Sequence, residues 1–345
     1  MSLIANLKIN NEKISFDLIN ISKEIKISLA NAIRRTIISD ITTYAIHDVT
    51  FFENTSMLNN QFLKHRLNLI PIISNMKNIN YENIIISCKK KNENENIESI
   101  YVSDFVCTDS ETNLVIDNNL IFKYPKILFG KLNNNNFISF EAKLMNNNSE
   151  YGGSFFSPVS ACIYTPKIDV NRANEITSNM SESEKKIFGL QEIERVYEKN
   201  EIGDPNIYQF VVESIGFYEP LEIILLGLEA LVTKLHNVKI EFRNSNSKKV
   251  ILNEMDDSQF YIFTIDHENE TVGNILSTYI TYHNNVFYSG YVIEHPLKYN
   301  ILLKVKLHTD NNLENVILII EETIDNTINV LDRIKNDLIL AHNAI

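Results

Sequence analysis

Arginine side chains in apolar surroundings are the features of this sequence whose type and position favour binding chemistry. Arg34 and Arg35 interrupt an apolar stripe of helical period, and Arg66 lies in the apolar stretch FLKHRLNLIPI. A guanidinium group is planar and can bind the carboxylates or carbonyls of another protein through directed hydrogen bonds. These positions therefore favour a protein-binding surface. The lysine groups at 89–91 and 185–186 are instead typical of solvated surface.

Catalytic signatures are missing from the sequence. It contains no GxSxG, GxxxxGK[ST], GxGxxG or HExxH motif, the patterns that mark serine hydrolases, P-loop enzymes, dinucleotide-binding enzymes and zinc proteases. The acidic pairs Asp256-Asp257 and Glu321-Glu322 are typical of a solvated face, because adjacent carboxylates on a helix or linker point apart. We therefore expect no catalytic residues in this chain.

The spacing of metal ligands is missing as well. The eight histidines are scattered, and Cys88, Cys107 and Cys162 lie far apart without a CxxC pair. Structural zinc requires four closed ligands, so we expect no metal and no cofactor. Three cysteines without a disulfide framework also indicate a reducing compartment.

Length, charge and hydropathy exclude several further classes. A chain of 345 residues suggests two or three domains, and 44% hydrophobic residues are an ordinary globular value. The net charge of −12 argues against a general nucleic-acid binder, because neutralising phosphates requires a surplus of Lys and Arg. No apolar run approaches the ~20 residues of a membrane span. We therefore expect no membrane contact and only indirect contact with DNA.

Alternating and helical periods predict an α+β chain. Residues 7–19 alternate as a β-hairpin does, and 25–39 repeat apolar residues at helical spacing. Residues 44–170 consist of short β-type runs separated by Asn- and Gly-rich turns. A polar connection with one helix near 182–196 follows, and then a strand at 207–217.

The C-terminal part continues with longer elements. Pro220 begins a second helix, because its fixed φ suits the first helical turn. Residues 244–257 are polar at both ends and suggest a linker. Beyond them the periods predict, in order, a strand at 260–265, a helix at 271–283, an antiparallel pair at 286–294 and 301–308, and a helix at 313–338.

One pattern occurs twice in the chain. Each copy is a strand, a polar turn, and a helix that begins with an apolar residue, a small residue and Asn, as in Leu29-Ala30-Asn31 and Val272-Gly273-Asn274. Two related units could pack as a pseudo-dimer in which each buries the apolar face of the other. Chance recurrence in an Asn-rich chain is the alternative.

Three stretches within the block at 13–72 form a specific pattern: LANAIRRTIIS at 29–39, ENTSML at 53–58 and FLKHRLNLIPI at 62–72. In order and spacing this block closely resembles the alpha-like subunits of multisubunit RNA polymerases. This family includes the bacterial alpha N-terminal domain, the archaeal D polypeptide and the third-largest subunit of eukaryotic polymerase II. FFSPV at 155–159 and VESIG at 212–216 resemble the family's return to its first domain.

The second half resembles the shorter partner of that polypeptide, archaeal L or the eleventh subunit of polymerase II. The matching stretches are FTI at 263–265, ETVGNIL at 270–276, GY at 290–291 and HPL at 295–297. The resemblance implies that both alpha-like subunits are fused in one polypeptide, as in large cytoplasmic DNA viruses. An AT-rich viral genome would also account for the abundance of Asn.

The resemblance implies a fold and its domains. We expect two alpha-like dimerisation units, each an antiparallel sheet packed on helices, that form an intramolecular pseudo-dimer. The first unit would comprise 1–43 and 205–243, with a mostly β insertion and connecting segment at 44–204. The linker 244–257 would lead to a smaller unit at 258–345. The implied seam contains Leu29, Ile33, Ile37, Leu225, Leu228, Leu235, Val272, Asn274, Leu276, Ile317, Ile324 and Leu331.

The resemblance also implies a function. The chain would be a non-catalytic assembly platform that recruits the second-largest and then the largest polymerase subunit, with small polymerase subunits as further partners. Mg²⁺ and any zinc would belong to those other chains, and the expected location is the host cytoplasm and virion, or alternatively the nucleus. The surface for the second-largest subunit would contain Asn31, Arg34, Arg35, Glu53, Asn54, Thr55, His65 and Arg66.

Two departures from the family pattern limit this expectation. Some members carry a cysteine cluster in the inserted domain, whereas the corresponding region here, about 75–95, has only Cys88. The chain also ends in a packing helix, without a DNA-binding domain of the bacterial kind. The rival interpretations are a free-standing β-rich binding module, which would not need paired Asn-containing helices, and a stand-alone enzyme, which would need convergent polar groups.

Overall fold

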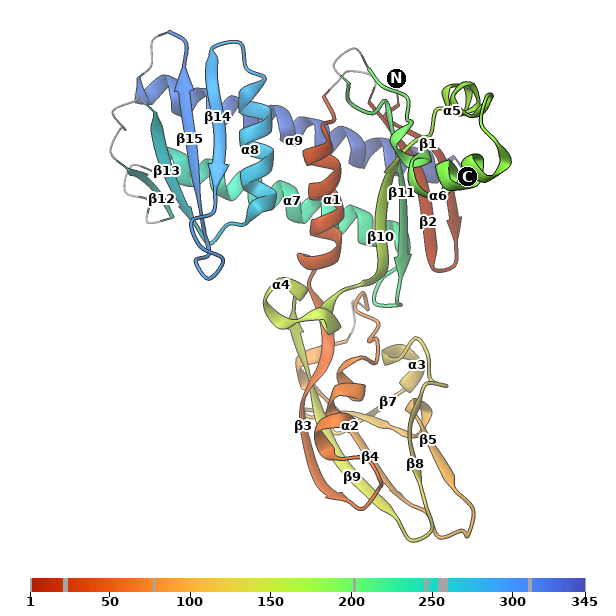
Figure 1. The fold of residues 1–345 in the computed structure, drawn as a ribbon. Helices are drawn as coiled ribbons and strands as arrows, with labels where there is room; N and C mark the ends of the chain where they lie inside the picture. Colours follow the sequence, from red (N-terminus) through yellow and green to blue (C-terminus); the bar gives the residue numbers. More distant parts are fainter. Residues whose placement is uncertain are drawn as a thin grey trace.

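The computed structural model describes residues 2–20, 24–76, 79–200, 203–244, 247, 249–253, 260–309 and 312–344. The expected α+β class is confirmed. Figure 1 shows two antiparallel sheets carried by long helices, and a separate, mostly β domain that projects from them. None of the helices in the described ranges combines the length and apolarity that a membrane crossing requires.

The first sheet has the strand order β1-β2-β11-β10, and all its pairs are antiparallel. Alternate residues of its two central strands face the helices, and the rings of Phe16 and Phe210 stack there with centroids 5.2 Å apart. Helix α7 begins at Pro220 as expected. The bounds of this unit are β1 Ile4–Asn10, β2 Lys13–Ile19, α1 Ile27–Ser39, β10 Val159–Pro166, β11 Ile207–Ser214 and α7 Pro220–Arg243.

The second sheet repeats this arrangement with the order β12-β13-β15-β14. In both units the chain runs through two strands, a helix, two strands and a long helix, so α1 corresponds to α8 and α7 to α9. The predicted repeat is therefore confirmed. The bounds are β12 Val250–Asn253, β13 Tyr261–Asp266, α8 Glu270–Thr281, β14 Val286–Val292, β15 Asn300–Leu307 and α9 Leu313–Asn343.

Two boundaries differ from the expected ones. β10 lies within the expected insertion 44–204, but it pairs with β11 and completes the first sheet. β12 lies within the expected linker 244–257, because Val250, Ile251 and Leu252 pair with β13. Positions 245, 246, 248 and 254–257 of that linker lie outside the described residues.

The inserted domain has its own core. Phe105 packs edge-on against the rings of Phe122, Phe129 and Phe140. A five-stranded sheet in the order β3-β9-β4-β6-β7 and the pair β5-β8 surround this cluster. The bounds are β3 Thr43–Asn54, α2 Asn60–Asn68, β4 Ile84–Lys91, β5 Glu98–Tyr101, β6 Val106–Asp109, β7 Val115–Ile116, α3 Asn118–Ile121, β8 Leu128–Leu132, β9 Phe137–Asn147 and α4 Ser149–Gly152. Short 3-10 helices lie at Tyr81–Asn83, Val102–Asp104 and Ser154–Phe156.

The connection between β10 and β11 contains two helices where one was expected. α5 spans Val170–Thr177 and α6 spans Glu182–Gln191, after which the chain forms a 3-10 turn at Ile193–Arg195. Asp169 and Ser181 cap the two helices by accepting backbone N–H groups of the first turns. α5 was not predicted from the sequence because most of its residues are polar, so no apolar repeat of helical period marks it.

One continuous buried cluster joins the two units. It combines the apolar faces of α1 and α7 with those of α8 and α9. Helices α1 and α7 pack closely at Gly227 of α7. A Cβ atom added to this glycine would lie 2.5 Å from Cγ1 of Ile37 in α1, so a larger residue would not fit without a shift. The expected seam positions that are buried in this cluster are Leu29, Ile33, Ile37, Leu228, Leu235, Val272, Leu276, Ile324 and Leu331.

Three other expected seam positions differ. Leu225 and Ile317 are half-buried and lie outside the shared cluster. The buried face of α7 runs through Ile224 and Leu228, so Leu225 is turned about 100° away from it. Asn274 is half-buried, and its Oδ1 accepts a hydrogen bond from Thr278 of the same helix at 3.3 Å.

Cutting the chain at a protease site inserted between Ser245 and Ser247 should leave the two fragments bound to each other. Ser245 lies outside the described residues, but β12 begins at Val250, so the cut leaves each four-stranded sheet intact. Obligate interfaces of this kind usually bury more than about 2,000 Å². The fragments should co-elute in gel filtration at ordinary salt. Separation into two folded monomers would contradict the pseudo-dimer.

Candidate functional site

The arginine pair lies on α1, at the centre of the molecule between the two sheets (Figure 1). Arg34 is half-buried, and its Nε donates to Oδ1 of Asn31 at 3.1 Å. Its charge lies near β10, since it opposes the rise that burial causes in the pKa values of Cys162 and Tyr164. Asn31 and Arg34 therefore form one polar unit on the surface of α1.

Arg35 points toward the second unit instead. Its Nη1 lies 3.3 Å from Oε2 of Glu270, the first residue of α8. The two side chains are 36% and 56% exposed, so this ion pair is solvated and adds little stability. The expected surface for a partner thus contains one arginine that already bridges the two units.

The other expected residues lie in the inserted domain. Glu53 and Thr55 are exposed at the end of β3, and the amide of Asn54 donates to the Leu58 carbonyl at 2.8 Å. His65 is exposed on α2. Arg66 of the same helix donates from Nη2 to the Leu128 carbonyl at 2.6 Å, which ties α2 to β8.

The structure does not bring these two groups together. β3 begins just after α1, and Glu53 is the eleventh of its 12 residues, which places Glu53 about 33 Å from the start of the strand at about 3.3 Å per residue. The α1 surface and the end of β3 are therefore separate surfaces. The family resemblance implied a single surface for both groups, and the length of the intervening strand was not foreseen.

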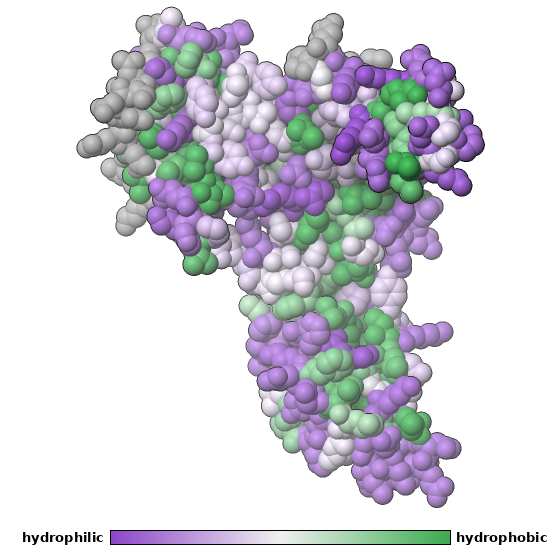
Figure 2. Space-filling view, in the orientation of Figure 1, coloured by the Kyte–Doolittle hydropathy of each residue, from purple (hydrophilic) through white to green (hydrophobic). Residues whose placement is uncertain are grey.

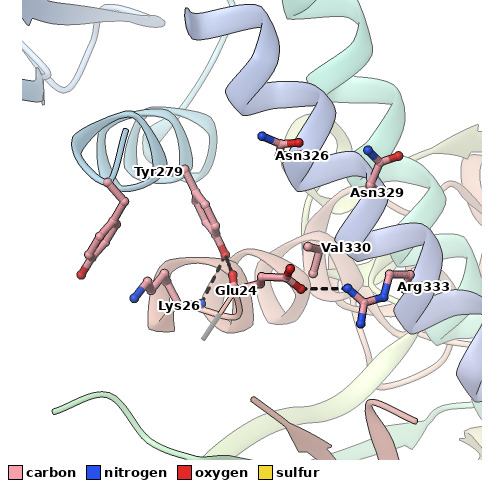
Figure 3. A pocket seen from close by; sticks show the side chains of 8 residues that line it. Glu24, Lys26, Tyr279, Asn326, Asn329, Val330 and Arg333 are labelled. Carbon is pink, nitrogen blue, oxygen red and sulfur yellow. Dashed lines mark hydrogen bonds and ion pairs between the residues drawn. The ribbon is translucent and has the colours of Figure 1, made fainter. Parts of the chain in front are cut away.

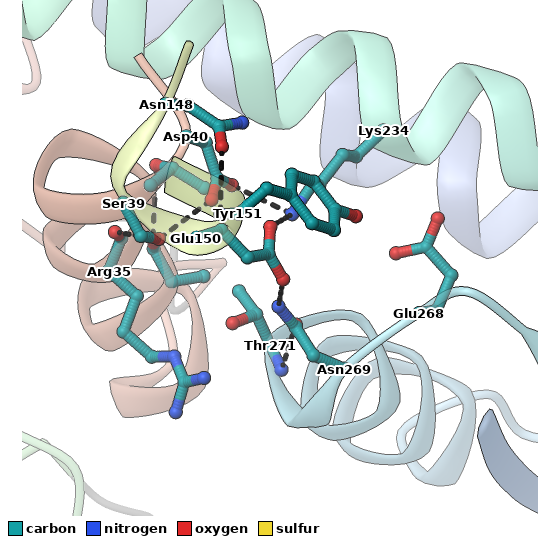
Figure 4. Close-up of polar contacts among 12 residues, drawn as sticks. Arg35, Ser39, Asp40, Asn148, Glu150, Tyr151, Lys234, Glu268, Asn269 and Thr271 are labelled. Atoms are coloured by element: carbon teal, nitrogen blue, oxygen red, sulfur yellow. Dashed lines mark hydrogen bonds and ion pairs between the residues drawn. The ribbon is translucent and has the colours of Figure 1, made fainter. Parts of the chain in front are cut away.

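A network around Lys234 is the polar site that sequence reasoning missed (Figure 4). Lys234 of α7 lies 2.9 Å from Asp40 at the end of α1 and 3.0 Å from Glu150 of α4. The amide of Asn269, just before α8, donates to the other oxygen of Glu150 at 2.7 Å. The network thus joins the first unit, the inserted domain and the second unit. Its only sequence signal is a lysine within the apolar helix α7.

Burial shapes the ionisation of this network. It raises the pKa of Asp40, although Lys234 and a hydrogen bond from Ser39 oppose the rise. Burial alone would lower the pKa of Lys234, but the carboxylates of Asp40 and Glu150 outweigh it and raise that pKa. The lysine therefore stays charged and holds both carboxylates.

A hollow of about 480 Å³ opens where the start of α1 meets α8 and α9 (Figure 3). Most of its charged groups are already paired. Arg333 lies 2.8 Å from Glu24, and the Lys26 ammonium lies 2.8 Å from Asp204 and 4.0 Å from the ring centre of Tyr282. The Tyr279 hydroxyl donates to the Glu24 carbonyl at 2.6 Å. These contacts fasten the two units together.

The described residues contain no group of three His, Cys, Asp or Glu side chains that could hold a metal ion. The three thiols are buried, and burial raises the pKa of Cys88 to about 11 and those of Cys107 and Cys162 to about 12. Thiols with such pKa values are poor nucleophiles and poor ligands at neutral pH. The ion pairs of Lys234 with Glu150 and of Arg35 with Glu270 join different parts of the protein.

Comparison with known proteins identifies the dimerisation units. Two family models, each described as the RNA polymerase Rpb3/Rpb11 dimerisation domain, match residues 21–235 and residues 261–337. The first match spans more than half of the chain. The chain therefore belongs to the RNA polymerase Rpb3/Rpb11 dimerisation domain family and contains two such domains.

Individual relatives match over shorter stretches. The chain is 54% identical over 46 residues to DNA-directed RNA polymerase subunit Rpo3 of Methanocaldococcus jannaschii, which covers 13% of this chain and 24% of the relative. It is 44% identical over 68 residues to DNA-directed RNA polymerase II subunit rpb3 of Dictyostelium discoideum, covering 20% and 21%. The matches thus span about a quarter or less of each relative.

Proposed function

We propose that this chain is the assembly platform of a multisubunit DNA-directed RNA polymerase, with both alpha-like subunits in one polypeptide. The observation that carries the proposal is the continuous core through which two Rpb3/Rpb11-type units pack on each other within one chain. A fused pair needs no separate dimerisation step. It presents two different units in fixed orientation to other polymerase chains.

The partners follow from this role. The second-largest subunit binds first and the largest afterwards, with small polymerase subunits around them, and the catalytic Mg²⁺ and any zinc belong to those chains. DNA contacts are indirect, in keeping with a net charge of −12. The proposed source is a large cytoplasmic DNA virus, and the proposed location is the host cytoplasm and virion, with the nucleus as the alternative.

The docking surface for the second-largest subunit is proposed on the exposed side of α1, with a second contact at the end of β3 and on α2. Arg34 is the main anchor, because its only protein hydrogen bond among the described residues is to Asn31, whereas Arg35 already pairs with Glu270. Glu53, Asn54, Thr55 and His65 supply the second contact. Arg66 positions α2 through its bond to Leu128.

Arg34→Ala should strongly reduce recovery of the second-largest subunit in a pull-down with the tagged chain. Removal of one member of a buried, charge-assisted pair typically costs about 2–5 kcal/mol. Arg172→Ala is the matched control, because Arg172 is an exposed arginine on α5. Equal recovery with both variants, at unchanged thermal stability, would refute the role of Arg34. A wild-type chain that recovers no polymerase subunit would refute the proposed function.

A further inference from the structure

β14 is an outermost strand with an unusual surface. It pairs with β15 along one edge, and no strand among the described residues pairs with its other edge. Its sequence, VFYSGYV, contains neither a charged residue nor proline. Phe287, Tyr288 and Val292 are 59%, 47% and 48% exposed. Figure 2 shows apolar side chains over the second sheet among polar ones.

Proteins usually protect such an edge from pairing with other chains. Common devices are lysine, proline, irregular pairing or a very short strand. Other outer strands of this molecule have them: β1 carries Lys8 and an irregularity between Ala5 and Lys8, and β7 is only two residues long. β14 has one irregularity, near Val286, and is otherwise unprotected over seven residues.

The corresponding strand of the first unit provides an internal comparison. β10 occupies the same place in its sheet as β14 does, but it ends at Pro166 and exposes a single large apolar side chain, Ile163. The two units share one architecture, so the architecture alone does not explain the aromatic surface of β14. The exposed aromatic surface is therefore particular to β14.

The charges beside β14 indicate what that chain is like. On the solvent side of the sheet, Tyr288 pairs with Lys306 and Gly290 with Lys304, so two lysines stand one strand inward from the open edge. Lys304 has no ion-pair partner among the described residues. A strand added to β14 would lie two strand spacings, about 10 Å, from β15. The long side chains of Lys304 and Lys306 can extend toward that strand, so their positive charge favours carboxylates on it. A second copy is disfavoured, because two chains of net charge −12 repel each other.

From these observations we infer that the open edge of β14 accepts a β-strand from another polymerase chain, one that carries acidic side chains on the face of Lys304 and Lys306. Backbone hydrogen bonds would supply the affinity, and the aromatic and lysine side chains the selectivity. This inference rests on the proposed function, since it takes the occupant from the polymerase assembly.

The test uses the full chain with Tyr288→Glu and Val292→Glu together, because carboxylates at these exposed edge positions would repel the acidic side chains of an added strand. Ile163→Glu on β10 is the matched control. We expect the double variant to recover at least one identified polymerase subunit about tenfold less than wild type does, while the control recovers all subunits normally. In the wild-type complex, hydrogen exchange of the β14 backbone amides should also slow relative to the free chain.

Each other outcome has a defined meaning. Equal recovery by all variants, or unchanged β14 exchange in the wild-type complex, overturns the inference and leaves the proposed function intact. The exchange measurement needs no substitution, so it stands even where the double variant fails to fold. A wild-type dimer that the double variant dissociates would show that the occupant is a second copy, which also overturns the inference. A wild-type chain that recovers no polymerase subunit overturns both proposals.

Discussion

Leu331→Asp should prevent the chain from folding into a single soluble species. Leu331 lies on α9, is 0% exposed, and belongs to the cluster that both units share. Loss of a buried leucine side chain costs about 2–5 kcal/mol, and an unpaired buried carboxylate adds several more. The sum approaches the whole stability of a typical domain, about 5–15 kcal/mol. Circular dichroism and gel filtration of the purified variant would measure the loss.

Leu318→Asp is the control for this prediction. Leu318 lies on the same helix, but it is 60% exposed, so the same substitution should change the thermal midpoint little. Both variants place Asp in the same helix, so the comparison separates the cost of burying a carboxylate from the low helix propensity of Asp. A folded Leu331→Asp variant that melts near the wild-type temperature would show that α9 does not form the seam, and it would refute the shared core.

The elements that the sequence predicted well are those whose signal is local. α7 and α9 repeat apolar residues at helical spacing over many turns, and Pro220 marks the start of α7. The hairpin of β1 and β2 alternates around a short turn. The repeat was visible because both units place a small residue and Asn near the start of a helix that packs closely on its neighbours. Local patterns of this kind are independent of the rest of the fold.

The elements that the sequence misjudged depend on distant partners. β10 reads as one more short strand of the insertion, and only its pairing with β11 places it in the first sheet. Leu225 continues the apolar stripe of α7, but the crossing of α7 with its neighbours buries Ile224 and Leu228 instead. The ion pair of Arg35 with Glu270 at the start of α8 was likewise not foreseen. None of these outcomes is encoded within a short window of residues.

The Lys234 network was missed for a related reason. Its members come from α1, α4, α7 and the turn before α8, and they are more than 100 positions apart at the extremes. Each is an ordinary polar residue in the sequence. Together they fix the inserted domain against the pseudo-dimer, because Glu150 follows the last strand of that domain and Lys234 belongs to the shared core helix.

Lys234→Met should destabilise the protein by about 2–4 kcal/mol at neutral pH. The Asp40 side chain is 5% exposed and would lose its counter-ion, and Glu150 at 23% would lose one as well. Breaking a buried pair by removing one partner typically costs about 3–5 kcal/mol, and the partial exposure of Lys234 lowers our value. Lys335→Met is the control, because Lys335 pairs with Glu229, which is 53% exposed, so its loss should cost below about 1 kcal/mol.

The loss of stability caused by Lys234→Met should also depend on pH. The ionisation of Asp40 determines whether the loss grows or shrinks as the pH falls. Burial raises the pKa of Asp40 in the folded protein, so its ionisation disfavours folding, and this penalty develops as the pH rises through the raised pKa. Lys234 offsets the penalty in the wild type and cannot do so once it is replaced. The stability difference between variant and wild type should therefore be largest near neutral pH and should shrink as the pH falls through the raised pKa of Asp40, where the carboxylate takes up a proton. Urea unfolding at several pH values would measure it, and a difference that grows on acidification would show that Asp40 is not the group that Lys234 holds in its charged form.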